Sequence, residues 1–264
     1  SHFQSAQNEF ISDDSQRLLI TPSHWAYLRI SLGCDRKCAF CTIPSIRGPF
    51  RSKPPREIIE EAAALANSGV KEINIIAQDS NYYGTDLNRK NPQSPKTSLA
   101  SILKKLEKIE NLPWIRTMYL YPAGVKNDLI ETIADSEKIL NYFDIPIQHI
   151  SDKILRDMNR ADTPEKTTAL IENIRKAIPS AVLRTTIIVG FPGETNEDFN
   201  QLLDFVKQTR FDALGCFKYS QETGTPAAKL PKQVPEQTKQ HRFDQLMAAQ
   251  KKIAIEKNKK LKGS

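Results

Sequence analysis

Residues 25–41 read WAYLRISLGCDRKCAFC, a strand-like run that leads directly into a loop with three cysteines. Apolar and polar residues alternate over residues 25–31, which is the pattern of a half-buried β-strand. The cysteines follow with the spacing Cys34-x3-Cys38-x2-Cys41, and the fourth cysteine, Cys216, is far away in the sequence. So few cysteines in 264 residues do not make a disulfide framework. The run therefore predicts a strand whose carboxyl end presents a cluster of thiols.

Strand-like and helix-like patterns alternate along the rest of the chain. Further strands are predicted over residues 72–79, 114–122, 142–148, 181–190 and 212–220. Helices are predicted over residues 54–69, 99–110, 126–137, 151–160, 164–178, 195–209 and 236–260. This alternation predicts an α/β fold with parallel strands, either an open doubly wound sheet or a partial (β/α)6 TIM-like barrel. In both architectures the functional loops lie beyond the carboxyl ends of the strands.

Composition limits the class of protein and its partners. The chain is 39% hydrophobic and 26% charged, as in a soluble globular protein, and it lacks an apolar run long enough to cross a bilayer. We expect a cytoplasmic protein with no membrane partner. The net charge of +7 suits an acidic or ribonucleoprotein partner, or describes a merely basic protein. We expect a leader over residues 1–20, a core domain over 21–257 and a basic tail over 258–264.

Three neighbouring thiols favour a metal site over chance burial. Thiolates are soft ligands that select zinc, Cu(I) or iron–sulfur clusters. A structural zinc ion needs four protein ligands, and no histidine near the loop completes such a set. A [4Fe–4S] cluster with three thiolate ligands leaves one iron open to a small chelating molecule. The alternative is a zinc-stabilised, non-catalytic adaptor or nucleic-acid-binding protein.

The cysteine spacing, with Phe40 before the last cysteine, resembles the hallmark of the radical S-adenosylmethionine (SAM) enzymes. The predicted β/α units are similar to that superfamily's partial barrel. The resemblance implies that Cys34, Cys38 and Cys41 hold a [4Fe–4S] cluster and that its open iron chelates SAM. It also implies reductive cleavage of SAM to a 5′-deoxyadenosyl radical, with an electron donor such as flavodoxin or ferredoxin. No acid–base residue is required for that step, so no catalytic side chain is assigned.

Longer blocks are similar to the methylthiotransferases over about residues 16–257. They read GVKEINIIAQDSNYYG, IPIQHISDKILRDMNR, LRTTIIVGFPGET and GCFKYSQETGTPAA. One branch of that family modifies an adenosine of tRNA (MiaB-type), and the other modifies the β-carbon of an aspartate in a small-subunit ribosomal protein (RimO-type). The pair Gln78-Asp79 resembles the ribosomal-protein branch, whereas the tRNA branch typically has Gln-Asn there. We expect the isolated catalytic core, without the family's amino-terminal domain, which holds a second cluster, or its carboxyl-terminal TRAM β-barrel.

The resemblance further implies contacts to SAM from several strand ends. Gln78 and Asp79 match the position that contacts the amino group of SAM. Gln148 matches the glutamine of the fourth strand that faces the SAM ribose or carboxylate. Arg184 suits the carboxylate, because a guanidinium binds that group through two parallel hydrogen bonds. The alternatives are a strand cap for Gln148 and a surface ion pair for Arg184.

Phe40 is expected to pack beside the cluster and the adenine, and three more positions are implied in the site. Gly190 and Gly193 of the loop VGFPGE would allow the close approach of backbone to the adenine ring, or simply serve a turn. Tyr219 is expected to line the pocket. His149 is expected to hold a hydrogen bond, and Cys216 is expected to be a buried strand residue.

Overall fold

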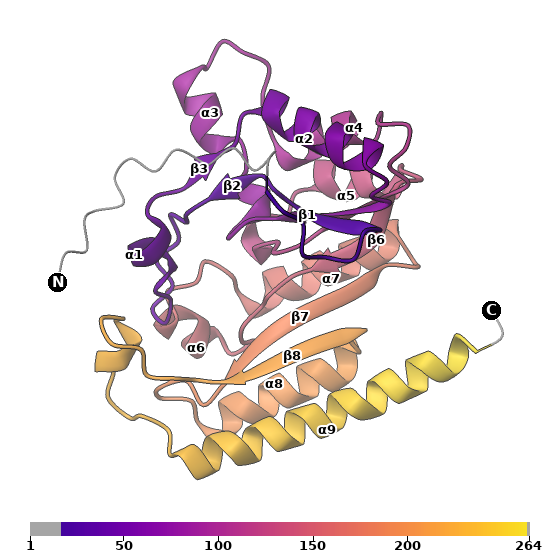
Figure 1. Cartoon of the computed structure of the whole chain (residues 1–264). Helices are drawn as coiled ribbons and strands as arrows, with labels where there is room; N and C mark the ends of the chain where they lie inside the picture. Colours follow the sequence, from indigo (N-terminus) through magenta and orange to yellow (C-terminus); the bar gives the residue numbers. More distant parts are fainter. Residues whose placement is uncertain (1–16, 263–264) are drawn as a thin grey trace. The chain divides into compact units, whose positions relative to one another are not determined.

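The computed structural model describes residues 17–262 (Figure 1). These residues form two compact units. The first unit consists of residues 17–36 and 43–142, and the second consists of residues 37–42 and 143–262. The core predicted over residues 21–257 is thus divided between them. Of the leader predicted over 1–20, residues 1–16 lie outside the described range, and residues 17–20 have no regular structure.

Six parallel-sheet strands confirm the α/β prediction. They are β1 (Trp25–Arg29), β4 (Glu72–Ile76), β5 (Trp114–Thr117), β6 (Ile139–Asp144), β7 (Val182–Val189) and β8 (Ala213–Lys218). Their order in the sheet is β1-β4-β5-β6-β7-β8, with β1 parallel to β4, β4 to β5 and β7 to β8. A doubly wound sheet reverses its strand order at a switch point. This order follows the sequence without reversal, so the (β/α)6 partial-barrel alternative holds.

Helices of the first unit pack their apolar faces against its strands. They are α2 (Pro55–Asn67), α4 (Leu99–Leu106) and α5 (Asn127–Ala134), and α2 contacts both β1 and α4 (Figure 1). Prolines stand at the start of α2, where a missing N–H costs nothing. Alternate strand residues such as Leu28, Ile73 and Ile75 are fully buried. The period-two patterns that predicted these strands therefore reflect one buried face.

The second unit contains α6 (Asp152–Asp157), α7 (Pro164–Ala177), α8 (Asn196–Thr209) and α9 (Glu236–Lys260). Local side chains start two of these helices, because Thr163 caps α7 and Thr195 forms a capping box with Asp198 at α8. Figure 1 shows α8 and α9 side by side, with α9 in contact with β7 and β8. Since α9 continues to Lys260, the tail predicted over 258–264 begins inside a helix.

Several short elements differ from the sequence-based expectation. A two-stranded antiparallel ribbon of β2 (Ser31–Leu32) and β3 (Arg51–Ser52), α1 (Ile43–Arg47) and α3 (Thr85–Lys90) were not predicted. The fourth strand lies over 139–144 instead of 142–148, because Pro146 has no N–H to donate to a ladder. None of the described helices combines the length and apolar character that crossing a membrane requires.

Candidate functional site: the cysteine loop and the strand ends

The first half of the cysteine loop is bound to the segment before β3. Cys34 is 9% exposed, and its N–H donates to the carbonyl oxygen of Gly48 at 3.2 Å. Asp35 accepts the N–H of Phe50 at 2.9 Å. Gly33 makes this approach possible, because its φ is +79° and a Cβ there would lie 2.2 Å from the oxygen of Pro49. The ribbon that sequence reasoning missed therefore positions the first cysteine.

Arg36 joins this half of the loop to the strand ends of the first unit. Its Nε donates to Asp79 Oδ2 at 2.8 Å, beyond the end of β4. Its guanidinium carbon lies 4.1 Å from the ring centroid of Tyr121, beyond β5, and 5.1 Å from that of Tyr82. The backbone N–H of Arg36 donates to Cys34 Sγ at 3.4 Å. Within this unit, the carboxyl-end loops converge as the alternating pattern predicted.

The second half of the loop is built into the second unit. Cys38 and Cys41 are half-buried and close a turn in which the N–H of Cys41 donates to the oxygen of Cys38 at 3.1 Å. Ala39 between them is buried. Its N–H donates to the carbonyl oxygen of Met158, and its carbonyl oxygen accepts the N–H of Ala227, each at 2.9 Å. The two hydrogen bonds hold this turn on the unit that carries β7 and β8.

An aromatic cluster lies behind this turn. Phe40 packs edge-on to Phe191 at 6.5 Å between ring centroids, and Phe191 packs on Tyr219 at 5.3 Å. Phe191 and Tyr219 are buried, and Phe40 packs against the same core. Phe40 and Tyr219 were each predicted to belong to the site, and the structure brings them together around Phe191. The sequence analysis did not select Phe191.

Gln148 lies beyond β6 in an unusual backbone conformation. Its φ is +66°, its N–H donates to Thr186 at 2.9 Å, and its carbonyl oxygen accepts from Ile188 at 2.8 Å. A non-glycine residue in this left-handed region is uncommon and marks a locally constrained position. Its Oε1 atom is buried and has no hydrogen-bond partner in the described part of the chain. A ligand hydroxyl or ammonium group would satisfy it.

Glu194 organises the glycine-containing loop after β7. Its Oε2 accepts the N–H groups of Gly190 at 2.6 Å and Phe191 at 3.2 Å, while Arg242 of α9 donates to Oε1 at 2.9 Å. Both charged side chains are nearly inaccessible, at 0% exposed for Glu194 and 5% for Arg242. Burial raises the pKa of Glu194 to about 7, although the charge of Arg242 and the two amides act in the opposite direction.

His149 faces this carboxylate without bonding to it. Its Nε2 lies 3.7 Å from Glu194 Oε2, and its Nδ1 accepts the N–H of Ser151 at 2.9 Å. Burial lowers the pKa of His149 to about 3, so the ring is neutral with its proton on Nε2. The prediction that His149 serves as a hydrogen-bonding residue is confirmed.

Two predicted SAM contacts take part in ion pairs within the protein. Asp79, which is 2% exposed, binds Arg36, and Arg184 donates to the fully buried Asp144 at 2.5 Å. Gln78, next to Asp79, is exposed. The described residues contain no group of three or more histidine, cysteine, aspartate and glutamate side chains arranged to hold a metal ion. The three-cysteine ligand set therefore stays a prediction from the spacing.

A family comparison now gives these residues a context. Residues 28–206 match the family described as the Radical SAM superfamily. This chain belongs to the radical SAM superfamily. The match begins within β1, includes the cysteine loop and ends in α8, so it spans both the thiols and the glycine-containing loop.

Individual radical SAM proteins resemble the chain to different extents. It is 47% identical over 253 residues to a ribosomal protein uS12 methylthiotransferase RimO of Geobacter sulfurreducens, which covers 96% of this chain and 55% of that protein. It is 48% identical over 248 residues to the RimO of Aquifex aeolicus, covering 94% and 56%. The chain thus spans about half the length of the curated relatives it matches.

Solved structures support the radical SAM fold alone, because their sequence identity is low. Coproporphyrinogen III oxidase (HemN) from Escherichia coli gives a TM-score of 0.59 at 18% identity, covering 86% of this chain and 52% of that one. Methylornithine synthase (PylB) gives 0.54 at 14% identity, covering 86% and 62%. The shared fold is the α/β architecture expected from the alternating pattern.

The glycines of the radical SAM loop after β7 differ in their surroundings. A Cβ at Gly190 would lie 2.3 Å from Cγ of Lys239, so a side chain of α9 approaches this residue closely. The approach of the Gly190 backbone to adenine stays a prediction. At Gly193, the nearest atom to such a Cβ is Lys153 Nζ at 3.6 Å, so that position is not crowded.

Three residues that organise this radical SAM core were missed from the sequence. Glu194 closes the quoted motif VGFPGE and would have been found by asking what satisfies the loop amides. Arg36 lies between two cysteines, and its charge was not used. Arg242 carries no local signal, because its role depends on α9 returning to β7. By contrast, Cys216 is a buried residue of β8 as predicted, and burial raises the pKa of its thiol to about 12.

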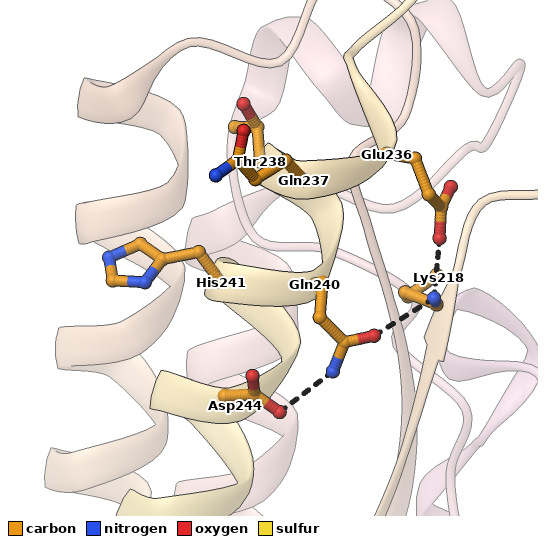
Figure 2. A pocket seen from close by; sticks show the side chains of 7 residues that line it. All are labelled: Lys218, Glu236, Gln237, Thr238, Gln240, His241 and Asp244. Carbon is orange, nitrogen blue, oxygen red and sulfur yellow. Dashed lines mark hydrogen bonds and ion pairs between the residues drawn. The ribbon is translucent and has the colours of Figure 1, made fainter.

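The chain also has a surface cavity that the radical SAM assignment does not use. A surface pocket of about 640 Å³ lies along the first turns of α9. Figure 2 shows the side chains that line it. The ammonium group of Lys218 pairs there with Glu236 and donates a hydrogen bond to the side-chain oxygen of Gln240. The side-chain nitrogen of Gln240 donates to Asp244. Its lining includes none of the predicted SAM contacts. The polar side chains at its centre are already bonded to one another.

Proposed function

We propose that this chain is the SAM-cleaving core of a methylthiotransferase that modifies the β-carbon of an aspartate in ribosomal protein uS12. The observation that carries the proposal is the identity of 47% to a RimO enzyme across 96% of the chain, with the three-cysteine loop inside the matched region. The predicted Gln78-Asp79 pair supports the same branch.

The donor chemistry of the loop fits an iron–sulfur cluster. Cys34, Cys38 and Cys41 would supply three thiolates and leave one iron for SAM. When bound, such a cluster supplies the electron that cleaves SAM to methionine and a 5′-deoxyadenosyl radical. Cys216 is buried in β8, so this chain supplies ligands for one cluster. The second cluster implied by the methylthiotransferase resemblance requires ligands other than these cysteines.

The chain's own residues would bind SAM and exclude water. The unsatisfied Oε1 of Gln148 suits a ribose hydroxyl or an ammonium group. Phe40 is partly buried beside Cys41 and is backed by the buried rings of Phe191 and Tyr219, and this apolar packing would keep water from a reactive radical. Arg184 is paired with Asp144, so its use as a carboxylate ligand would require sharing that guanidinium.

Partners follow from the proposed reaction. The protein substrate is uS12, which places the enzyme in the cytoplasm. The reduction requires a one-electron donor, and the net charge of +7 suits a small acidic redox protein of the flavodoxin or ferredoxin type.

The cofactor assignment is tested by anaerobic reconstitution with iron and sulfide. We expect absorbance at about 400 nm from a thiolate-bound cluster. We also expect the release of 5′-deoxyadenosine from SAM when the cluster is reduced. Cys38→Ala removes one ligand and should abolish both, whereas the matched control Cys216→Ala keeps both. A protein that instead retains one zinc ion with a fourth protein ligand contradicts the proposal.

The substrate is tested by a chimera in which these residues replace the matching segment of a full-length RimO. The chimera is offered uS12 and tRNA in parallel, and the products are weighed by mass spectrometry. We expect methylthiolation of uS12. A modification that occurs on tRNA alone would assign the chain to the adenosine-modifying branch.

A further inference from the structure

Arg36 holds more of the first unit together than a surface arginine does. It contacts Asp79 beyond β4 and Tyr121 beyond β5, and both belong to loops that the chain reaches more than 40 residues later. Its side chain is 30% exposed, but the carboxylate that it binds is 2% exposed. A buried carboxylate that loses its partner is costly, whereas an exposed ion pair contributes little. The pair is therefore a constraint on the loop.

We propose that Arg36 is a positioning residue that fixes the first half of the cysteine loop, and that Asp79 holds it there through Oδ2. The planar guanidinium is suited to this role, because it can stack on Tyr121 while its edge donates to Asp79. A lysine would supply the charge without the stacking plane.

The main chain carries this constraint to the thiol. The N–H of Arg36 donates to Cys34 Sγ at 3.4 Å, and the N–H of Cys34 donates to Gly48 at 3.2 Å. Hydrogen bonds to cluster sulfurs raise the reduction potential, because they stabilise the additional negative charge of the reduced state. This part of the inference rests on the proposed function, in which Cys34 is a cluster ligand. The anchoring of the loop does not.

The anchoring is measured without cluster, by hydrogen exchange of the Cys34 and Arg36 amides in the metal-free chain. We expect about tenfold faster exchange in Arg36→Gln and in Asp79→Asn, the loss typical of one charge-assisted hydrogen bond. The double variant should exchange no faster than either single variant, because both remove one interaction. The matched control is Arg56→Gln, which removes the exposed Arg56–Glu60 ion pair of the same unit and should change nothing.

The cofactor consequence is measured on the reconstituted chain. Arg36→Gln and Asp79→Asn should both shift the cluster to a more negative potential in a redox titration followed by electron paramagnetic resonance. Arg36→Lys should restore part of the shift, since charge returns without stacking. SAM affinity should fall in Arg36→Gln, although this variant leaves Asp79 in place. If Asp79→Asn weakens SAM binding tenfold or more while Arg36→Gln leaves both affinity and exchange unchanged, Asp79 is a SAM ligand and the inference is overturned.

The experiments distinguish a wrong function from a wrong role for Arg36. Wild-type chain that takes up no cluster contradicts the proposed function, and the exchange experiment still decides whether Arg36 anchors the loop. Where Asp79→Asn does not fold, Tyr121→Leu removes the stacking surface and leaves the carboxylate in place. Unchanged exchange in Tyr121→Leu and in Arg36→Gln would contradict the anchoring.

Discussion

The cysteine loop and the glycine loop after β7 are each held by an arginine–carboxylate pair, and the two pairs differ in burial. Arg36 keeps 30% of its side chain exposed and lies over the rings of two tyrosines. Arg242 is 5% exposed and faces Glu194, which is fully buried. Both arginines position a loop at a strand end, but only the second pair is removed from water on both sides.

This difference in burial separates the two loops in their response to pH. Burial raises the pKa of Glu194 to about 7 in spite of its cation. Burial is also the largest single influence on Arg36 and opposes its charge, but the hydrogen bond to Asp79 and the neighbouring negative charges together outweigh it, so the pKa of Arg36 is raised. The glycine loop is therefore held by a group that titrates near neutrality, whereas the arginine of the cysteine loop keeps its charge throughout.

Removing the two arginines tests the comparison most strongly. Arg242→Met leaves Glu194 buried without its cation, and breaking such a buried pair costs about 3–5 kcal/mol. Arg36→Gln should cost about 1–2 kcal/mol, because water reaches the gap that it leaves. The free energies of unfolding from urea titration measure both.

The control for this test is an exposed ion pair to the same helix, α9. Arg210 pairs with Glu256 of α9, and both side chains are more than 40% exposed. Arg210→Gln should therefore change the free energy of unfolding by less than about 1 kcal/mol. Equal losses in the Arg242 and Arg210 variants would show that burial does not distinguish these pairs.

The titration of Glu194 gives the next largest effect. Its pKa is raised from 4.5 to about 7, so the folded state binds the proton more tightly than the unfolded state does. The contribution of protonated Glu194 to the free energy of unfolding is present in full below about pH 4.5 and is lost as the pH rises through about 7. It amounts to at most about 3 kcal/mol. His149 acts in the opposite sense, because its pKa is lowered from 6.5 to about 3 and its stabilisation is lost as the pH falls.

The two contributions are separated by a difference measurement. Glu194→Gln removes the titrating carboxyl and leaves His149, Asp198 and Arg242 in place. The stability of the wild type relative to this variant should decrease between pH 5 and pH 8. A relative stability that does not change over this range would mean that Glu194 is ionised throughout.

Some of this site follows from local sequence, and some depends on contacts that no local pattern encodes. The six strands of the sheet were predicted, with the fourth displaced to residues 139–144, because apolar patterns reflect burial within a few residues. The cysteine spacing identified the superfamily because it is also a local pattern. The β2–β3 ribbon was missed because two-residue strands leave no periodic signal.

Pairs between distant elements were also out of reach of the sequence. Asp79 is predicted to contact SAM from its position after β4, and this stays a prediction. Its ion-pair partner Arg36 is 43 residues away, so no local pattern indicates the pair. Glu194 and Arg242 are separated by 48 residues. A buried carboxylate requires a partner, but the sequence does not say which of many arginines supplies it.

The smallest effect distinguishes the two glycines of the loop and tests whether α9 holds it. Both have positive φ, +73° at Gly190 and +81° at Gly193, so alanine costs about 1–2 kcal/mol at either. At Gly190 the new methyl group would also meet Lys239, whose stem cannot withdraw easily because Nζ donates to Tyr219 at 2.8 Å. Gly190→Ala should therefore exceed Gly193→Ala by about 1–3 kcal/mol in the free energy of unfolding. In a Lys239→Ala background this excess should disappear. Equal losses of stability in Gly190→Ala and Gly193→Ala would show that α9 does not hold the glycine loop.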